Sequence, residues 1–238
     1  MPKYNVKLVK KELIAAETMA FSFEKPEGFD FRAGQFCDIT LFDPPETDAE
    51  GNIRGFSLVQ APFEDEVVVA TRMRDTAFKR VLKDLPLGTV VELDAAYGDF
   101  TLHKTVTTPA VFIIGGIGIT PVRSIIAQAT HDAVAQDITL FHVNRTAAEA
   151  PFAADFEGLA RENERFTFVP VMTQASPTEW FGERGHVSAE MLAKYVPDLA
   201  APIYYMSGPA GMVMATRQLL LDSGANEDNI RTEEFSGY

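Results

Sequence analysis

The sequence predicts two domains: an N-terminal antiparallel β-barrel followed by an α/β domain built on an open parallel sheet. Residues 4–103 hold short strand-like runs with turn residues between them, which is typical of a barrel. After residues 105–109, apolar strands alternate with helical stretches, which indicates a parallel sheet. With 238 residues the chain is long enough for two such domains. We place the boundary after residue 104, so the expected domains are 1–104 and 105–238.

The barrel strands are expected where apolar runs lie between proline and glycine breakers. These runs are 4–13, 18–23, 35–41, 56–60, 67–73 and 90–93. A helix is expected over 76–85, because apolar residues recur there at helical spacing. The single cysteine, Cys37, lies in an alternating strand and is expected to be a small buried side chain. One cysteine also excludes an internal disulfide and an iron–sulfur cluster held by four cysteines of this chain.

The second domain is expected to begin with the apolar strand that starts at Ala110. Thr120 is then the expected N-cap of a helix, with Pro121 at the first helical position. Further strands are expected at 138–143, 166–172 and 203–206, with helices after Phe152, at 188–195 and at 209–223. Gly224 is the expected residue just past the end of the last helix.

The charge and hydropathy of the chain exclude several classes of function. The formal net charge is -13 and the pI is about 4.7, which argues against nucleic acid or an anionic membrane surface as the main partner. No apolar run approaches the length that spans a membrane, and the first residues lack the apolar core of a signal peptide. The four histidines lack the spacing of metal ligands. We therefore expect a cytoplasmic protein without a metal.

The most informative motif is the glycine turn after the strand from Ala110. Gly115, Gly116 and Gly118 precede Thr120, so a strand, a turn of little bulk and a helix start follow one another. Backbone N–H groups and the helix dipole at such a point can hold a phosphate. The alternative is a tight connection that binds no ligand.

Four weaker motifs accompany the glycine turn, and each has a simpler alternative. Arg54-Gly-Phe-Ser57 offers a phosphate ligand beside a flat ring, or is a loop arginine beside an ordinary strand. The basic stretch 72–83 contains Thr76 as a helix cap, or is a solvated helix face. A second glycine-rich turn follows Met206. The chain ends on Tyr238, which is either functional or part of a frayed tail.

In this order, the motifs resemble the ferredoxin–NADP reductase superfamily over essentially the whole chain. The resemblance is greatest to compact bacterial reductases without a fused iron–sulfur or haem domain. It implies a flavin-binding barrel followed by an NAD(P)-binding α/β domain. The implied flavin-contacting residues are Arg54 (phosphate), Phe56 (ring packing), Ser57 (hydrogen bond to ring N5), Leu58 and Val59 (backbone contacts), Thr76 and Ala77 (N–H groups to the pyrophosphate) and Tyr238 (stacking on the ring).

For the pyridine nucleotide, the resemblance implies a site made of both glycine turns. The residues lining it are Gly115, Gly116, Gly118, Ile119, Thr120, Ser207, Gly208 and Pro209, with Ser207, Gly208 and Pro209 beside the nicotinamide. Ser57, Ser207 and Tyr238 are the implied catalytic residues. Arg145 ends the second strand of this domain, where it favours NADPH by meeting a 2′-phosphate, unless it is only a surface arginine. Glu233 and Glu234 either relay a proton or are a solvated pair.

Three departures from the family pattern limit this transfer of roles. Phe56 replaces the usual tyrosine, so it can stack but lacks a hydroxyl group. Ser207 replaces a common cysteine, which puts its part in hydride transfer in doubt. Residues 95–100 replace a more usual Gly-Pro-x-Gly run, so the surroundings of the flavin are expected to depart from the family pattern there.

The expected function is that of a ferredoxin- or flavodoxin–NAD(P)+ reductase, with FAD (FMN is the less favoured flavin) passing electrons from NAD(P)H to a one-electron acceptor. The basic stretch 72–83 offers a docking surface for an acidic ferredoxin or flavodoxin. One alternative is a flavin reductase that uses diffusible flavin. Another is a nucleotide-binding electron-transfer or regulatory subunit of a larger complex. A dehydrogenase without flavin is disfavoured, because it leaves the N-terminal half without a role.

Overall fold

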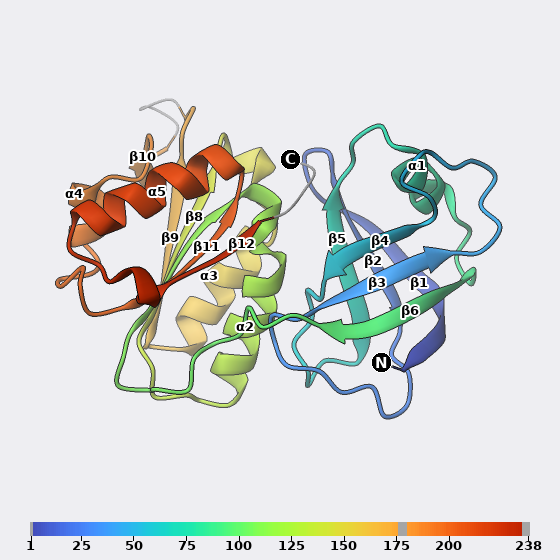
Figure 1. The fold of residues 1–238 in the computed structure, drawn as a ribbon, viewed down its shortest axis with the longest axis horizontal. Coiled ribbons are helices and arrows are strands. Elements are labelled where there is room, and N and C mark those ends of the chain that lie inside the picture. The colour runs from blue at the N-terminus through green and yellow to red at the C-terminus, as the bar shows by residue number, and fades with distance from the viewer. Residues whose placement is uncertain (1, 176–179, 235–238) are drawn as a thin grey trace. The chain divides into compact units, whose positions relative to one another are not determined.

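The computed structural model describes residues 2–175 and 180–234, and it divides into two compact units (Figure 1). The N-terminal unit contains residues up to Thr101 together with Thr120–Gln128. The C-terminal unit contains Leu102–Ile119 and the chain from Ala129 onward. The domain boundary after residue 104 stays a prediction.

The N-terminal unit is an antiparallel sheet of six strands in the order β4-β3-β6-β1-β2-β5. The strands are β1 (Lys3–Ala15), β2 (Thr18–Glu24), β3 (Phe36–Leu41), β4 (Ile53–Ser57), β5 (Glu66–Arg72) and β6 (Val90–Tyr97). An isolated bridge between Leu58 and Val69 joins the chain just after β4 to β5, at the opposite edge of the sheet. This bridge brings the two edges together, so the predicted barrel is confirmed.

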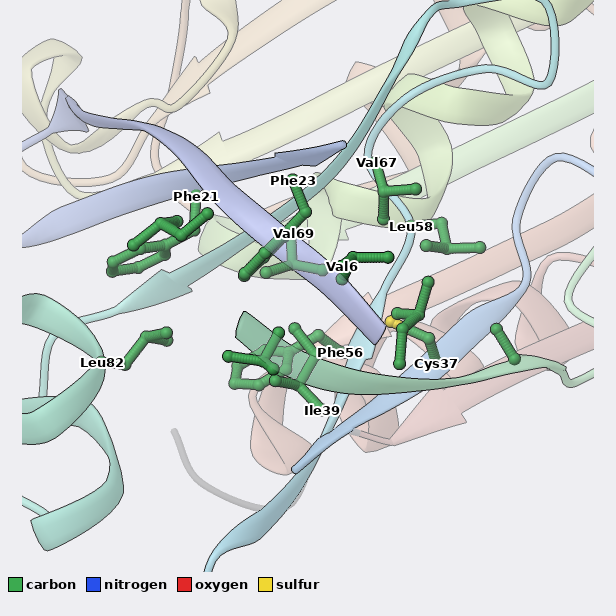
Figure 2. Close-up of a cluster of buried hydrophobic side chains, with 14 of the residues drawn as sticks. Val6, Phe21, Phe23, Cys37, Ile39, Phe56, Leu58, Val67, Val69 and Leu82 are labelled. Atoms are coloured by element: carbon green, nitrogen blue, oxygen red, sulfur yellow. The ribbon is translucent and has the colours of Figure 1, made fainter. Parts of the chain in front are cut away.

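The interior of the barrel is filled by side chains that alternate along its strands (Figure 2). The helix α1 (Ala77–Asp84) contributes Phe78 and Leu82 to the same core. Cys37 is fully buried among these residues, and burial raises the pKa of its thiol well above the usual range. Its predicted role as a small buried side chain is therefore confirmed.

The predicted strand 56–60 is wrong in its bounds. β4 starts at Ile53 and ends at Ser57, where it pairs with β3. Leu58 and Val59 instead turn to the other neighbour, and the Val59 N–H donates to Val68 O at 2.9 Å. The apolar run thus crosses from one strand partner to another, which periodicity alone does not show.

The C-terminal unit is a parallel sheet of six strands in the order β10-β9-β8-β7-β11-β12, which confirms the predicted α/β fold. The strands are β7 (Ala110–Gly115), β8 (Ile138–Asn144), β9 (Phe166–Met172), β10 (Glu183–Arg184), β11 (Ile203–Gly208) and β12 (Ile230–Glu234). The helices of this half of the chain are α2 (Thr120–His131), α3 (Ala153–Glu162), α4 (Ala189–Ala193) and α5 (Ala210–Asp222), with 3₁₀ turns at Gly116–Ile119, Ala147–Glu149 and Glu227–Asn229.

Both faces of this sheet are covered, which explains its almost continuous apolar strands. On one face, Val111, Phe141 and Met206 pack against α4 and α5. On the other, Phe156 of α3 packs against Phe168 of β9, with ring centroids 5.4 Å apart. The strand order reverses at β7, because β8 lies on one side of it and β11 on the other. In open parallel sheets, ligands bind at the carboxyl ends of strands beside such a reversal.

Two details of the C-terminal half correct the sequence analysis. Thr120 is not an N-cap, because the 3₁₀ turn Gly116–Ile119 runs directly into α2 and makes Thr120 part of the helix. Residues 230–234 are not a frayed tail, because they form β12 and pair with β11 in parallel. Gly224 has a φ of +91° just past α5, so its predicted place at the helix end is confirmed. Among the described residues, none of the helices combines the length and hydropathy that crossing a membrane needs.

Candidate functional site

The end of β4 places a buried hydroxyl group in the N-terminal unit. Ser57 is 4% exposed, and its Oγ has no hydrogen-bond partner among the residues that the structure describes. A buried hydroxyl without a partner is unfavourable, so such a group suits a position that a ligand completes. The next two residues use their N–H groups within the barrel, since Leu58 donates to Gln35 O and Val59 to Val68 O, both at 2.9 Å.

Arg54 and the first turn of α1 converge on one carboxylate. Asp48 Oδ1 lies 3.0 Å from Arg54 Nη2, and Asp48 Oδ2 accepts from the Ala77 N–H at 3.2 Å. Burial disfavours the charge on Asp48, but hydrogen bonds from the N–H groups of Glu50 and Ala77 and from Arg54 outweigh it and lower the pKa. Two donors that are far apart in the chain therefore face a single anionic group.

Further positive charge surrounds this point. Lys79 follows Thr76, whose Oγ1 accepts from the Lys79 N–H at 3.4 Å and caps the helix as predicted. The Lys79 ammonium donates to Arg72 O at 2.8 Å. Burial, followed by the charges of Arg74 and Arg54, lowers the pKa of Lys79 to about 8. The three cations are therefore close enough to act on one another.

In the C-terminal unit, the two glycine turns pack against each other. A Cβ atom on Gly208 would lie 3.0 Å from Cα and N of Gly115, and one on Gly115 would lie 2.8 Å from Cδ of Pro209. These turns are the carboxyl ends of β7 and β11, where the strand order reverses. Side chains larger than hydrogen would push the turns apart, so glycine at both positions permits this close approach.

The second buried serine lies at the end of β11. Ser207 is fully buried beside Ile114 of β7, and its Oγ has no hydrogen-bond partner within residues 2–175 and 180–234. Both serines with predicted catalytic roles thus carry a buried hydroxyl without a partner in the described chain. Each lies in a different unit.

The comparisons with known proteins agree with this geometry. Residues 112–218 match a family model described as an oxidoreductase NAD-binding domain. The chain is 31% identical over 209 residues to the reductase component DmpP of phenol 2-monooxygenase from Pseudomonas sp. (strain CF600), covering 86% of this chain and 58% of the relative. It is 27% identical over 232 residues to one component of the Na(+)-translocating NADH-quinone reductase of Pseudoalteromonas atlantica, covering 90% and 56%. The chain spans between 50% and 68% of the length of such relatives.

Solved structures share the whole fold. A ferredoxin NADP+ reductase from Neisseria gonorrhoeae has a TM-score of 0.80 at 23% identity, covering 98% of this chain and 99% of that one. The flavohem-like FAD/NAD binding domain of nitric oxide dioxygenase from Vibrio cholerae has a TM-score of 0.84 at 21% identity, covering 98% of each chain. The chain belongs to the ferredoxin–NADP reductase superfamily. It is accordingly an oxidoreductase.

Several residues with predicted roles in this reductase have partners or surroundings that the sequence does not show. Phe56 is 8% exposed and packs on Phe78 at 5.8 Å between ring centroids, so it is mainly a core side chain. The Thr76 N–H already donates to Arg74 O at 2.9 Å. Arg145 is held by Glu149, which accepts from Nε at 3.0 Å and also from Nη2. The predicted roles of these residues stay predictions.

The remaining predicted residues of the nucleotide site lie in or beside the glycine turn of β7. Gly116, Gly118 and Ile119 form the 3₁₀ turn, and Thr120 begins α2 with its side chain buried. Tyr238 lies outside the described residues. The sequence analysis missed Asp48 and Glu149, whose carboxylates meet the two arginines with predicted ligand roles. The spacing of four residues between Arg145 and Glu149 was the only available signal.

Proposed function

We propose that this reductase binds FAD in its N-terminal unit and NAD(P)H in its C-terminal unit, and passes electrons from the nucleotide to a one-electron acceptor. The observation that carries the proposal is the convergence of Arg54 and the Ala77 N–H on one carboxylate. A carboxylate and a phosphate oxygen accept the same donors, and both are favoured at a helix N-terminus. A flavin phosphate fits where Asp48 now lies.

When bound, the flavin accepts a hydride from the nicotinamide and releases electrons singly. The chain contributes binding and orientation. Arg54 and the first turn of α1 hold the phosphate, and Ser57 Oγ hydrogen-bonds the ring at N5. The buried, partnerless hydroxyl of Ser57 in the described chain supports this role.

For the nucleotide, the packed glycine turns let a ligand approach the backbone at the ends of β7 and β11. Gly115, Gly116, Gly118, Ile119 and Thr120 line one side of the site, and Ser207, Gly208 and Pro209 line the other. Tyr238 covers the flavin ring until the nicotinamide replaces it. Deleting Tyr238 therefore changes the affinity for the nucleotide and the preference between NADPH and NADH, and unchanged kinetics on both counts would remove this role.

Asp48 also favours a second candidate function. A flavin phosphate must displace this carboxylate, which weakens the retention of FAD or FMN. A reductase that uses flavin as a diffusible substrate would show this behaviour. The two functions differ in one measurement, namely whether flavin stays with the protein through desalting.

For the acceptor, we propose a redox protein such as a ferredoxin or a flavodoxin. The reductase components of monooxygenases among the relatives of this chain support an electron-transfer partner of this kind. The basic stretch 72–83 supports docking less than its sequence suggests, because Arg80 pairs with Glu46 at 2.6 Å and also with Asp75. Arg72 lies 3.5 Å from Glu17.

A visible absorption spectrum of the purified protein tests the proposed function. We expect a flavin spectrum after reconstitution with FAD, bleaching on anaerobic addition of NADPH or NADH, and recovery when an oxidised ferredoxin or flavodoxin is added. Flavin that is bleached but lost on desalting would favour the diffusible-flavin function. Protein that binds neither FAD nor FMN would overturn both.

A further inference from the structure

His142 is a buried ionisable group to which the proposed function gives no task. It lies on β8 and is fully buried, with its ring 6.3 Å from that of Phe156 between centroids. Its Nε2 lies 3.2 Å from the carbonyl oxygen of Gly116. Its Nδ1 has no hydrogen-bond partner in the part of the chain that the structure describes. One end of this ring therefore faces the glycine turn, and the other faces the interior.

The contact with Gly116 fixes the tautomer of the ring. A carbonyl oxygen can only accept, so Nε2 carries the proton and Nδ1 is a bare acceptor. A buried acceptor without a partner lowers stability, whereas an apolar side chain at the same place would not. Stability alone therefore favours leucine over histidine at this position. A side chain that costs stability points to a role in function.

Gly116 is the residue whose orientation matters most in the turn. It follows β7 directly, opens the 3₁₀ turn and has a φ of +51°. Glycine allows the peptide planes on either side to rotate easily. In a trans peptide the carbonyl and the following N–H point in opposite directions. Drawing the Gly116 carbonyl toward His142 thus turns the Ile117 N–H away from β8.

We propose that His142 is a positioning residue, which holds the glycine turn in the conformation that binds the phosphates of the pyridine nucleotide. The proposal rests on the proposed function, because that function places the nucleotide at this turn. His142 does not touch the nucleotide in this account. It acts through the peptide that follows Gly116.

Binding of ADP-ribose, measured by isothermal titration calorimetry, tests the proposal without turnover. His142→Leu removes the donor, and we expect it to weaken ADP-ribose binding about tenfold. His142→Gln keeps an N–H donor near the position of Nε2, and we expect affinity within about threefold of the unchanged protein. The melting temperature of H142L should equal or exceed that of the unchanged protein, because the unpaired Nδ1 is gone.

The matched control is His103→Leu, which removes the other buried histidine of the C-terminal unit. His103 Nδ1 lies 3.0 Å from the hydroxyl of Tyr205, so H103L should melt at a lower temperature while ADP-ribose affinity stays within about twofold.

Two results would overturn the inference alone: equal affinities of H142L and the unchanged protein, or H142Q as weak as H142L. Failure of the unchanged protein to bind ADP-ribose, NAD+ or NADP+ would overturn the proposed function and this inference with it.

Discussion

The backbone N–H of Ala77, in the first turn of α1, donates to Asp48 Oδ2 at 3.2 Å. The same carboxylate also pairs with Arg54 Nη2 at 3.0 Å. A helix start beside an arginine attracts an anion, and here the chain itself supplies one. Any flavin phosphate that binds at this point therefore competes with Asp48.

Replacing Asp48 by asparagine should tighten the binding of flavins that carry phosphate. The amide keeps the size of the side chain but removes its charge, so we expect FAD and FMN to bind about three- to tenfold more tightly. Riboflavin has no phosphate, and its affinity should not change. The quenching of flavin fluorescence measures all three dissociation constants. Asp43→Asn is the control, since Asp43 lies on the same loop and is exposed. A parallel gain for riboflavin would contradict the competition.

Replacing Ser57 by alanine should separate stability from activity. The Ser57 hydroxyl has no partner in the described chain, so its loss should leave the melting temperature of the flavin-free protein unchanged or slightly raised. With FAD bound, we expect hydride transfer from NADPH to slow about tenfold or more, measured as bleaching in a stopped-flow instrument. Ser22→Ala removes another buried barrel serine and should leave this rate unchanged. An unchanged rate in S57A would remove Ser57 from the reaction.

Much of this fold follows from local pattern. The alternating strands of the barrel and the apolar strands of the sheet are visible in the sequence, because burial on one face or on two leaves different periodicities. The glycine turn after Ile114 is visible because side chains are excluded there. β12 was missed, since the strand is recognised only by its pairing with β11.

The site depends more on contacts between distant residues, and these are what the sequence hides. Asp48 and Ala77 meet only after the barrel has formed. His142 resembled a scattered histidine, since nothing in its neighbours shows that β8 places it against Gly116. Motifs therefore located the turns and the helix start, while the side chains that tune them required the structure.

Replacing Glu149 by glutamine should shift the coenzyme preference toward NADPH. Glu149 now holds both ends of the Arg145 guanidinium and adds a negative charge beside it. Both effects oppose a 2′-phosphate at Arg145. We expect the ratio of kcat/KM for NADPH to that for NADH to rise about three- to tenfold in E149Q. Glu157→Gln, on the exposed side of α3, is the control. An unchanged ratio would mean that Arg145 does not meet the 2′-position.

His142 should also make the stability of the protein depend on pH. Burial lowers its pKa to about 4 in the folded chain, against an ordinary value of 6.5. Between these values the unfolded chain binds a proton that the folded chain does not, so stability falls as the pH falls. At about 1.4 kcal/mol per pKa unit, this group removes about 3 kcal/mol between pH 7 and pH 4. Urea unfolding across this range should show a shallower pH dependence in H142L than in the unchanged protein. His103, whose pKa burial also lowers, remains in both proteins and accounts for part of the residual slope. Identical slopes would mean that the ring of His142 is solvated in the folded protein, which would also weaken its contact with Gly116.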